Sequence, residues 1–196
     1  TLNEGDELAF CSISSGENDI ILATANGQGI RFKETEVRSM GRQAAGVYGI
    51  RLRKGDYVVG MEVISNGGDL LFATENGYGK RVSLADFRVA HRSGLGVRTI
   101  PTTTRNGKVI GLAIVSEQSN ILLIDMAGKI IRLSPTEIRT MGRQAAGVRL
   151  IRLDEGQKLA TMVAFEEEDS GSSDDGESES HGSKAGVAPA QKADSF

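Results

Sequence analysis

The stretch that decides the fold is the heptapeptide Gly-Arg-Gln-Ala-Ala-Gly-Val at residues 41–47, which returns letter for letter at residues 142–148. A looser copy, Arg-Ser-Gly-Leu-Gly-Val, lies midway between them at residues 92–97. The corresponding glycines are 50 and 51 residues apart. Because self-similarity at a fixed period marks a repeat architecture, the sequence predicts successive structural units that pack against one another.

Each repeat opens with two segments that predict a β-hairpin. An Asn-Gly turn joins the two segments in the first and second repeats, and an Ala-Gly turn joins them in the third. In the second segments apolar residues tend to alternate with basic or polar ones, so one face is expected to look inward and the other outward. The first segments are residues 19–24, 69–74 and 120–125. The second segments are residues 30–33, 80–84 and 131–133.

Two more strands are expected after the heptapeptide of each repeat. The third strands are expected at residues 47–53, 97–103 and 148–153. The fourth strands, each after a tight glycine turn, are expected at residues 57–64, 109–115 and 158–165. Four strands in a repeat of about 50 residues predict an all-β fold built from propeller-like blades.

The repeats divide the chain into a body, residues 1–165, and a tail, residues 166–196. Within the body, Gly5-Asp6 matches Gly55-Asp56, so residues 1–13 are expected to supply the closing strands of an earlier blade. The three full blades are expected at residues 19–64, 69–115 and 120–165.

Body and tail carry opposite charge. The body contains 21 Lys and Arg against 17 Asp and Glu, whereas the tail contains 2 against 9. The net charge of -3 therefore conceals a basic body. Because the tail is rich in Ser, Gly, Asp and Glu and holds little that could be buried, it is expected to be disordered.

Nine arginines fall at three equivalent places in the repeat. In a radial array, equivalent residues occupy the same place on successive blades, so each set is expected to form a row along one rim. Guanidinium groups stay charged and offer a fork of donors that suits phosphate, so a curved band of them predicts binding of bent double-stranded DNA. The rows are Arg31, Arg81 and Arg132; Arg38, Arg88 and Arg139; and Arg42, Arg92 and Arg143.

The alternative interpretation of these arginines is a solvated strand face paired with acids. Candidate acids are Glu34, Glu36, Asp86 and Glu137. The heptapeptide likewise has two interpretations. Its glycines either provide positive φ angles and close approach to the next blade, or the loop displays its arginine and its backbone amides to phosphate.

The sequence offers no catalytic constellation. Its two histidines, His91 and His181, support neither a metal cluster nor a histidine-based triad, and no glycine-rich run has the spacing of a nucleotide-binding loop. Asp19 and Asp69 recur at a strand start, which we interpret as turn chemistry. Cys11 is the single cysteine, and no apolar run is long enough to span a bilayer, so an intracellular protein without a membrane segment is expected.

Three runs of residues resemble one known family. They are Asn-Gly-Tyr-Gly-Lys-Arg at residues 76–81, Val-Arg-Ser-Met-Gly-Arg at residues 37–42 and Ala-Gly-Val-Tyr-Gly-Ile-Arg-Leu at residues 45–52, together with the acidic C-terminus. The body is similar to the C-terminal domain of the A subunit of DNA gyrase. The resemblance implies a six-bladed β-pinwheel that wraps DNA around a basic perimeter. This chain would hold its last three blades and the end of the blade before.

The resemblance also implies a role and partners. The domain would support ATP-dependent negative supercoiling in the bacterial cytoplasm, at the nucleoid. Its partners would be duplex DNA, the rest of a homodimeric A subunit, and the B subunit of an A2B2 assembly. ATP and Mg2+ would be used by other parts of the enzyme, and this chain would hold neither a cofactor nor a metal. The DNA-binding residues would be Arg31, Arg38, Arg42, Lys80, Arg81, Arg88, Arg92, Arg98, Lys129, Arg132, Arg139, Arg143 and Arg149.

Two alternatives to this function remain at this point. The related protein of topoisomerase IV shares the blade plan. A protein-binding propeller of the kelch or WD type is a different class, although the chain has no tryptophan for a WD signature. The family's hallmark box, Gln-Arg-Arg-Gly-Gly-Arg-Gly, does not occur in this chain, and residues 41–47 and 142–148 resemble its degenerate counterparts. None of the tyrosines of this chain lies in a sequence that matches the one around the strand-cleaving tyrosine of the family.

Overall fold

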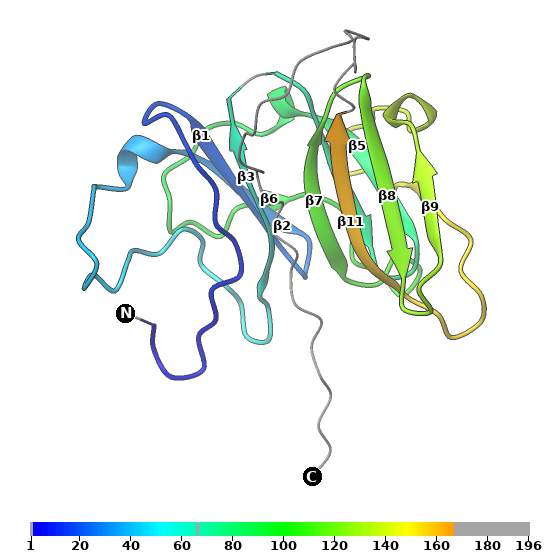
Figure 1. The fold of residues 1–196 in the computed structure, drawn as a ribbon, viewed down its shortest axis with the longest axis horizontal. Helices are drawn as coiled ribbons and strands as arrows, with labels where there is room; N and C mark the ends of the chain where they lie inside the picture. The colour runs from blue at the N-terminus through cyan, green and yellow to red at the C-terminus, as the bar shows by residue number, and fades with distance from the viewer. Residues whose placement is uncertain (1, 66, 167–196) are drawn as a thin grey trace, which may run out of the picture.

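The computed structural model describes residues 2–65 and 67–166, which form three antiparallel sheets side by side (Figure 1). The first repeat contributes β1 (Asp19–Thr24), β2 (Gln28–Lys33) and β3 (Val58–Ile64). The second contributes β4 (Asp69–Thr74), β5 (Tyr78–Ser83), β6 (Val97–Arg98) and β7 (Val109–Val115). The third contributes β8 (Ser119–Asp125), β9 (Ile130–Leu133), β10 (Val148–Arg149) and β11 (Leu159–Glu166).

A single 3₁₀ turn follows the second strand of every repeat. These turns are η1 (Glu34–Glu36), η2 (Leu84–Asp86) and η3 (Pro135–Glu137). In the third repeat the turn begins with a capping box, because the Ser134 hydroxyl accepts from the Thr136 amide while the Glu137 carboxylate accepts from the Ser134 amide. The turn redirects the chain away from the sheet and toward the loop that carries the heptapeptide.

The hairpins and the fourth strands are confirmed, and the sheets exchange a strand between repeats. The strand order is β3-β1-β2-β6 in the first sheet, β10-β5-β4-β7 in the second and β11-β8-β9 in the third. β6 comes from the second repeat but pairs with β2 of the first, and β10 comes from the third repeat but pairs with β5 of the second. Each four-stranded blade is therefore completed by the repeat that follows it, which links neighbouring blades through backbone hydrogen bonds.

The prediction of long third strands within each repeat is wrong. Only residues 97–98 and 148–149 form strands, and residues 47–53 form none. After two paired residues the chain bends over the hairpin turn of the preceding blade, where the Thr99 amide donates to the Gly27 carbonyl and the Leu150 amide donates to the Gly77 carbonyl. The hairpin turn ends the ladder because these amides bond to the turn instead of to a strand.

The expectation that residues 1–13 supply the closing strands of an earlier blade stays a prediction, because the described residues do not include the hairpin of that blade. Residues 2–13 contain a turn, in which the Asp6 amide donates to the Asn3 carbonyl, and no strand. A closing strand needs the hairpin of its own blade as a partner, and the described residues before β1 contain no hairpin. Most side chains of this segment are exposed. The predicted tail lies outside the described residues except for Glu166, which ends β11.

Burial follows the position of each blade in the stack. All but the first residue of β4 are buried, because the middle sheet is covered on both faces. β8, in the last sheet, alternates between buried and half-buried residues. The innermost strands β3, β7 and β11 lie next to one another in succession, and Gly60 on β3 leaves no room for a side chain, since a Cβ there would lie 2.6 Å from the Cβ of Leu112.

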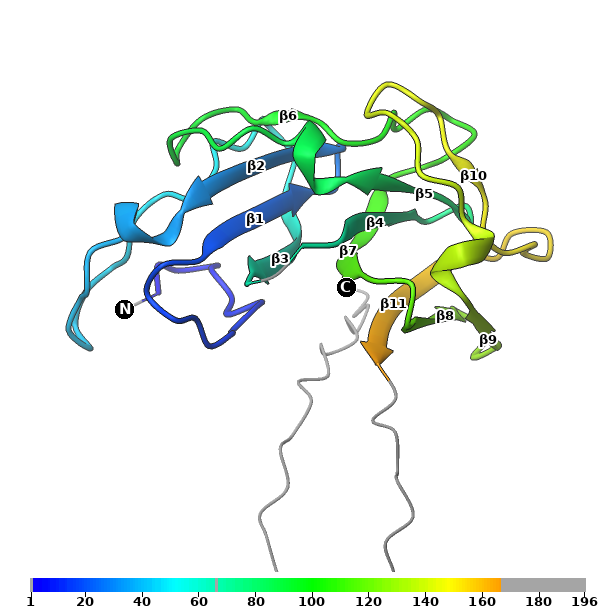
Figure 2. The same cartoon turned by 90° about the horizontal axis from the view of Figure 1, so that it is seen from above.

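Two apolar clusters join the three sheets. The first lies between the first and second blades and includes Ile21, Phe72 and Phe87, and the second lies between the second and third and includes Leu71 and Ile151. Seen from above, the blades fan outward from the side of β3, β7 and β11, and the loops that contain β6 and β10 lie on the opposite, outer side (Figure 2). We call this side, defined by β2, β5, β9 and the loops that pack on them, the outer edge.

Candidate nucleic-acid interface

The heptapeptide loop of the third repeat is fixed by two side chains of the second. The Lys80 ammonium donates to the carbonyl oxygens of Gly142 and Ala145 at 3.0 Å and also to that of Arg143. The Asn106 amide donates to the carbonyl oxygen of Ala146 at 2.8 Å. Carbonyl oxygens along the loop are thus satisfied from one blade, so the loop conformation is set by the blade that receives it.

The prediction that Lys80 contacts DNA is wrong. Its side chain is fully buried, with 0% exposure, and all three of its donors are used within the protein. Burial and the neighbouring Arg143 lower the pKa of Lys80 to about 8. The carbonyl acceptors favour the ammonium form, so Lys80 is charged at neutral pH and holds the loop as a buried cation.

The equivalent position of the first repeat shows why the loop sequences differ. Ile30 stands where Lys80 stands in the second repeat, and it faces the looser loop at residues 92–97. A Cβ on Gly94 would lie 3.3 Å from the Cδ1 of Ile30. The lysine thus accompanies the full heptapeptide, whose carbonyls it binds, while the isoleucine accompanies the looser copy.

The last glycine of the loop is required by close approach to the preceding blade. Gly96 and Gly147 have φ angles of 72° and 87°, and a Cβ on either would lie 2.5 Å from the carbonyl oxygen of Gly29 or Gly79. Positive φ and lack of space both favour glycine. The packing interpretation is therefore confirmed for these two glycines, whereas Gly142, at the start of the loop, has open space around it.

The first arginine row joins blades to one another. The guanidinium of Arg31 forms an ion pair with Asp19 at 2.6 Å and donates to the carbonyl oxygens of Leu84 and Phe87 in the next repeat, each at 3.2 Å. Burial by itself would raise the pKa of Asp19, but hydrogen bonds and charge from Lys33 and Arg31 outweigh it and hold the pKa below its usual range. Asp19 is thus a carboxylate that anchors Arg31.

Arg81 repeats this arrangement one blade further on. Its guanidinium pairs with Asp69 at 3.1 Å, donates to the Thr140 hydroxyl at 2.9 Å and donates to the Pro135 carbonyl oxygen at 3.0 Å. The interpretation of Asp19 and Asp69 as turn chemistry is wrong, because both carboxylates form ion pairs with arginines. Contact with DNA stays a prediction for Arg31 and Arg81, and the structure shows a structural role for both. Their donors bind protein groups across the blade junction.

The third member of this row is more exposed. Arg132 donates from Nε to the amide oxygen of Asn120 at 2.8 Å and lies 6.0 Å from the ring of Phe165. Asn120 occupies the place of Asp19 and Asp69, so the carboxylate is replaced by a neutral amide in the third repeat.

The row of the heptapeptide arginines is uneven. Arg42 is exposed, whereas Arg92 is half-buried and donates to the carbonyl oxygens of Glu36 at 3.2 Å and Tyr48 at 3.1 Å. Arg143 is half-buried, with its guanidinium 5.9 Å from the ring of Phe87. Only Arg42 presents an exposed side chain, so this row does not form a uniform band.

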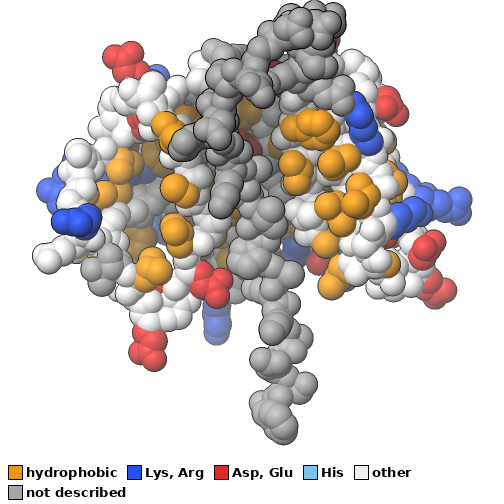
Figure 3. All heavy atoms as spheres, in the orientation of Figure 1, with side chains coloured by type: hydrophobic (Ala, Val, Ile, Leu, Met, Phe, Trp, Pro, Cys, Tyr) orange, Lys and Arg blue, Asp and Glu red, His pale blue; other side chains and the backbone are white. Residues whose placement is uncertain are grey.

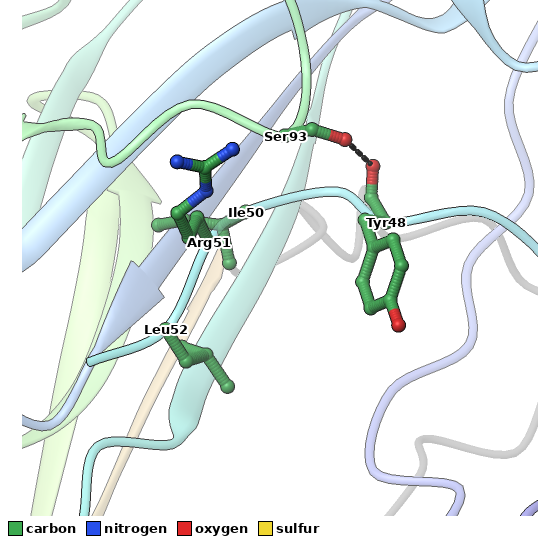
Figure 4. A pocket seen from close by; sticks show the side chains of 5 residues that line it. All are labelled: Tyr48, Ile50, Arg51, Leu52 and Ser93. Carbon is green, nitrogen blue, oxygen red and sulfur yellow. Dashed lines mark hydrogen bonds between the residues drawn. The ribbon is translucent and has the colours of Figure 1, made fainter. Parts of the chain in front are cut away.

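The loop of the second repeat is also tied to residues 48–52 of the first. Ser93 is, within residues 2–65 and 67–166, the one non-glycine residue with a positive φ, 66°. Its hydroxyl donates to the carbonyl oxygen of Tyr48 at 2.9 Å, beside the hollow drawn in Figure 4. The hollow is lined by Tyr48, Ile50, Arg51, Leu52 and Ser93.

The second row is the one that faces solvent throughout. Arg38, Arg88 and Arg139 are exposed, and each lies two residues after a 3₁₀ turn. None of the three has a hydrogen bond or ion pair within the described part of the chain. Because the turns recur with the fold, these three guanidinium groups recur on successive blades. The remaining predicted residues, Arg98, Lys129 and Arg149, are exposed as well.

The face opposite the outer edge has a different character. Figure 3 shows hydrophobic side chains over the sheet of β8 and β11, with Lys and Arg side chains toward the margins of the view. Val163 and Phe165 on β11 are exposed large hydrophobic residues. Within the described residues no group of three metal-binding side chains occurs, and none of the helices has the length and hydropathy needed to cross a bilayer.

Comparison with known proteins identifies the family. The family model of the DNA gyrase C-terminal domain, a beta-propeller, matches residues 18–65, 68–116 and 120–166. The chain belongs to this family. The three matched ranges correspond to the three repeats that build the sheets of the structure.

Related proteins agree with the family model. The DNA gyrase A subunit of Aminobacterium colombiense is 43% identical over 168 residues, which cover 86% of this chain and 21% of that protein. A solved structure of the DNA gyrase A C-terminal domain superposes with a TM-score of 0.78 at 27% identity, over 84% of this chain and 56% of the other. The C-terminal domain of DNA topoisomerase IV superposes with a TM-score of 0.72 at 29% identity, over 77% and 47%. The chain thus spans about a fifth of the curated relatives it matches.

Proposed function

We propose that this chain binds double-stranded DNA along its outer edge and bends it, as a DNA-wrapping part of a gyrase A protein. The observation that supports this most directly is the row Arg38, Arg88 and Arg139. These side chains are exposed and have no partner among the described residues, and the blade repeat places them in succession. Cations spaced along a curved edge suit a phosphate backbone that curves with it.

The set of cations that face DNA in this proposal differs from the set predicted from the sequence. Arg31, Lys80 and Arg81 stabilise the blade junctions, so the DNA contacts come from the exposed second row and from Arg42, Arg98 and Arg149. Phosphate contacts position a protein without reading bases, so little sequence specificity follows, with a preference for easily bent DNA.

The larger assembly is part of the same proposal. Family membership and relatives that are gyrase A proteins support a place in a gyrase complex, with the chemistry of strand cleavage and ATP hydrolysis in other parts of that complex. The topoisomerase IV protein is the second candidate, favoured by a similar fold at 29% identity. Gyrase has more support, because both the family model and the curated relatives are gyrase proteins.

The test is the salt dependence of duplex binding. Each phosphate contact contributes about 0.9 to the slope of log K against log salt concentration, so the triple variant R38A/R88A/R139A is expected to reduce the slope by roughly 3. The matched control K54A/K108A/K158A removes three exposed charges from the turns that precede β3, β7 and β11. We expect it to leave most of the slope intact. Equal losses in both variants would show that net charge, rather than the row, carries binding.

A further inference from the structure

Two guanidinium groups converge on Tyr78 at the outer edge. The Arg149 Nη2 atom donates to the Tyr78 hydroxyl at 2.9 Å, and its Cζ lies 5.5 Å from the ring centroid. The Arg105 Cζ lies 4.3 Å from the same centroid. The three side chains come from β5, from the loop between β6 and β7 and from β10 of the next repeat, so the cluster exists only because the strand exchange places Arg149 opposite Tyr78.

The backbone of this cluster is fixed from several sides. The Asn76 side chain donates to the carbonyl oxygens of Thr104 at 3.0 Å and Arg105 at 3.1 Å. The next residue, Asn106, is fully buried and donates to the carbonyl oxygen of Pro101 as well as to that of the heptapeptide loop. Arg105 therefore extends from an anchored loop rather than from a free one.

The electrostatics of the cluster are unbalanced. Neither Arg105 nor Arg149 forms an ion pair with a carboxylate among the described residues, and both side chains are exposed. The negative face of the Tyr78 ring and its hydroxyl oxygen offset part of the repulsion between the two cations. The hydrogen bond from Arg149, together with the positive charge of Arg149 and Arg105, lowers the pKa of Tyr78. An anion with several acceptor oxygens would complete the site.

We propose that Tyr78, Arg105 and Arg149 form a phosphate-binding subsite for the backbone of double-stranded DNA. The inference rests on the proposed function and adds to it a second line of contact. Tyr78 begins β5, whereas Arg88 follows η2 beyond the other end of that strand. Because a strand rises about 3.3 Å per residue, the two ends of β5 are roughly 17 Å apart. A duplex along the outer edge would meet the protein on two parallel lines.

The other repeats indicate where this subsite is strongest. Gln28, Arg53 and Arg98 hold the equivalent positions in the first blade, where Gln28 pairs with Arg98 of the second repeat in the sheet. That blade keeps two cations but replaces the aromatic ring. In the third repeat the positions of Tyr78 and Arg105 are Lys129 and Asp154, and the sheet has no fourth strand among the described residues. Within residues 2–65 and 67–166, the middle blade is the one in which two guanidinium groups lie against the same tyrosine ring.

The experiment uses the full chain and a linear duplex, with affinity measured from 50 to 200 mM salt. We expect R105A/R149A to reduce the slope of log K against log salt concentration by about 1 to 2, with a loss of affinity of about tenfold or more near 0.1 M. R105K/R149K retains both positive charges but loses the forked donor geometry of the guanidinium groups. It is expected to recover part of the affinity that R105A/R149A loses. The control pair K54A/K158A removes the same charge from turns before the inner strands.

Three results separate the possible failures. If the unmodified chain binds with a steep slope that R38A/R88A/R139A reduces, while R105A/R149A leaves the slope unchanged, the subsite is refuted and the proposed function stands. If the unmodified chain shows no salt-dependent binding, both fail. If R105A/R149A lowers the unfolding temperature without a change in slope, the subsite is refuted and the cluster is a structural link between repeats. Y78F, which keeps the ring and removes the hydroxyl, should leave the fold intact and weaken binding less than the double variant.

Discussion

Replacing Lys80 by Met isolates the role of the buried ammonium. The methionine side chain keeps most of the volume and removes the donors, so the carbonyl oxygens of Gly142, Arg143 and Ala145 lose their shared partner. A buried acceptor without a partner costs about 1 to 3 kcal/mol. Because water can reach part of the loop, we expect K80M to lower the free energy of unfolding by about 3 to 5 kcal/mol in total.

The assay is thermal unfolding together with duplex binding below the transition. For a domain of this size each kcal/mol shifts the midpoint by about 2 to 4 °C, so the expected decrease is about 6 to 20 °C. Since Lys80 is fully buried, the salt slope of binding should stay as in the unmodified chain. The reasoning is refuted if K80M unfolds at the original temperature and the salt slope falls by about 1, because Lys80 would then be a phosphate contact.

A rescue variant tests the match between this residue and its loop. K80I alone is expected to destabilise the chain as K80M does. Adding Q144S/A145G/A146L gives the centre of the loop the three residues found in the loop that faces Ile30 in the first repeat. If the loop and the residue beneath it act as a unit, the combined variant should be more stable than K80I, which a double-mutant cycle measures directly.

Two further predictions concern pH and the blade junction. Burial raises the pKa of Glu62 to about 7, above its ordinary 4.5, so its charge destabilises the folded state and stability should fall as the pH rises from about 4.5 to about 7. E62Q should remove this fall, so its free energy of unfolding should exceed that of the unmodified chain by about 1 to 3 kcal/mol at pH 8 and differ little from it near pH 4. An equal difference in unfolding temperature at both pH values would contradict this prediction. G147A should cost about 2 to 4 kcal/mol in chemical denaturation, because a Cβ would lie 2.5 Å from the Gly79 carbonyl oxygen and φ is positive. G142A, with open space around it, is the matched control and should change stability by less than about 1 kcal/mol.

The hairpins could be predicted from local sequence because their causes are local. A mainly apolar segment and an alternating segment, joined by a tight turn that ends in glycine, favour a two-stranded unit through local sequence. β1 and β2 accordingly form at the expected place, with Ile21 buried and facing Arg31 across the ladder. The fourth strands were predictable for the same reason, since each is an apolar run after a glycine turn.

The strand exchange could not be predicted from the same pattern. A period of about 50 residues shows that segments are equivalent, but it does not say whether a segment completes its own sheet or the sheet before it. Val97 and Val148 pair with strands of the preceding repeat, because Gly96 and Gly147 let the chain pass close to the backbone of that blade. That choice depends on the space between two blades and therefore on tertiary packing.

The sequence by itself determined the repeat, its hairpins and which arginines are equivalent. Only the tertiary structure decided what each cation touches. Arg31 and Arg88 are both members of regular rows, yet Arg31 meets Asp19 and two carbonyl oxygens of the next repeat, whereas Arg88 faces solvent. The physical reason is that periodicity fixes the position of a residue along its own repeat, while its partners lie on the neighbouring blade and are set by how the blades are packed.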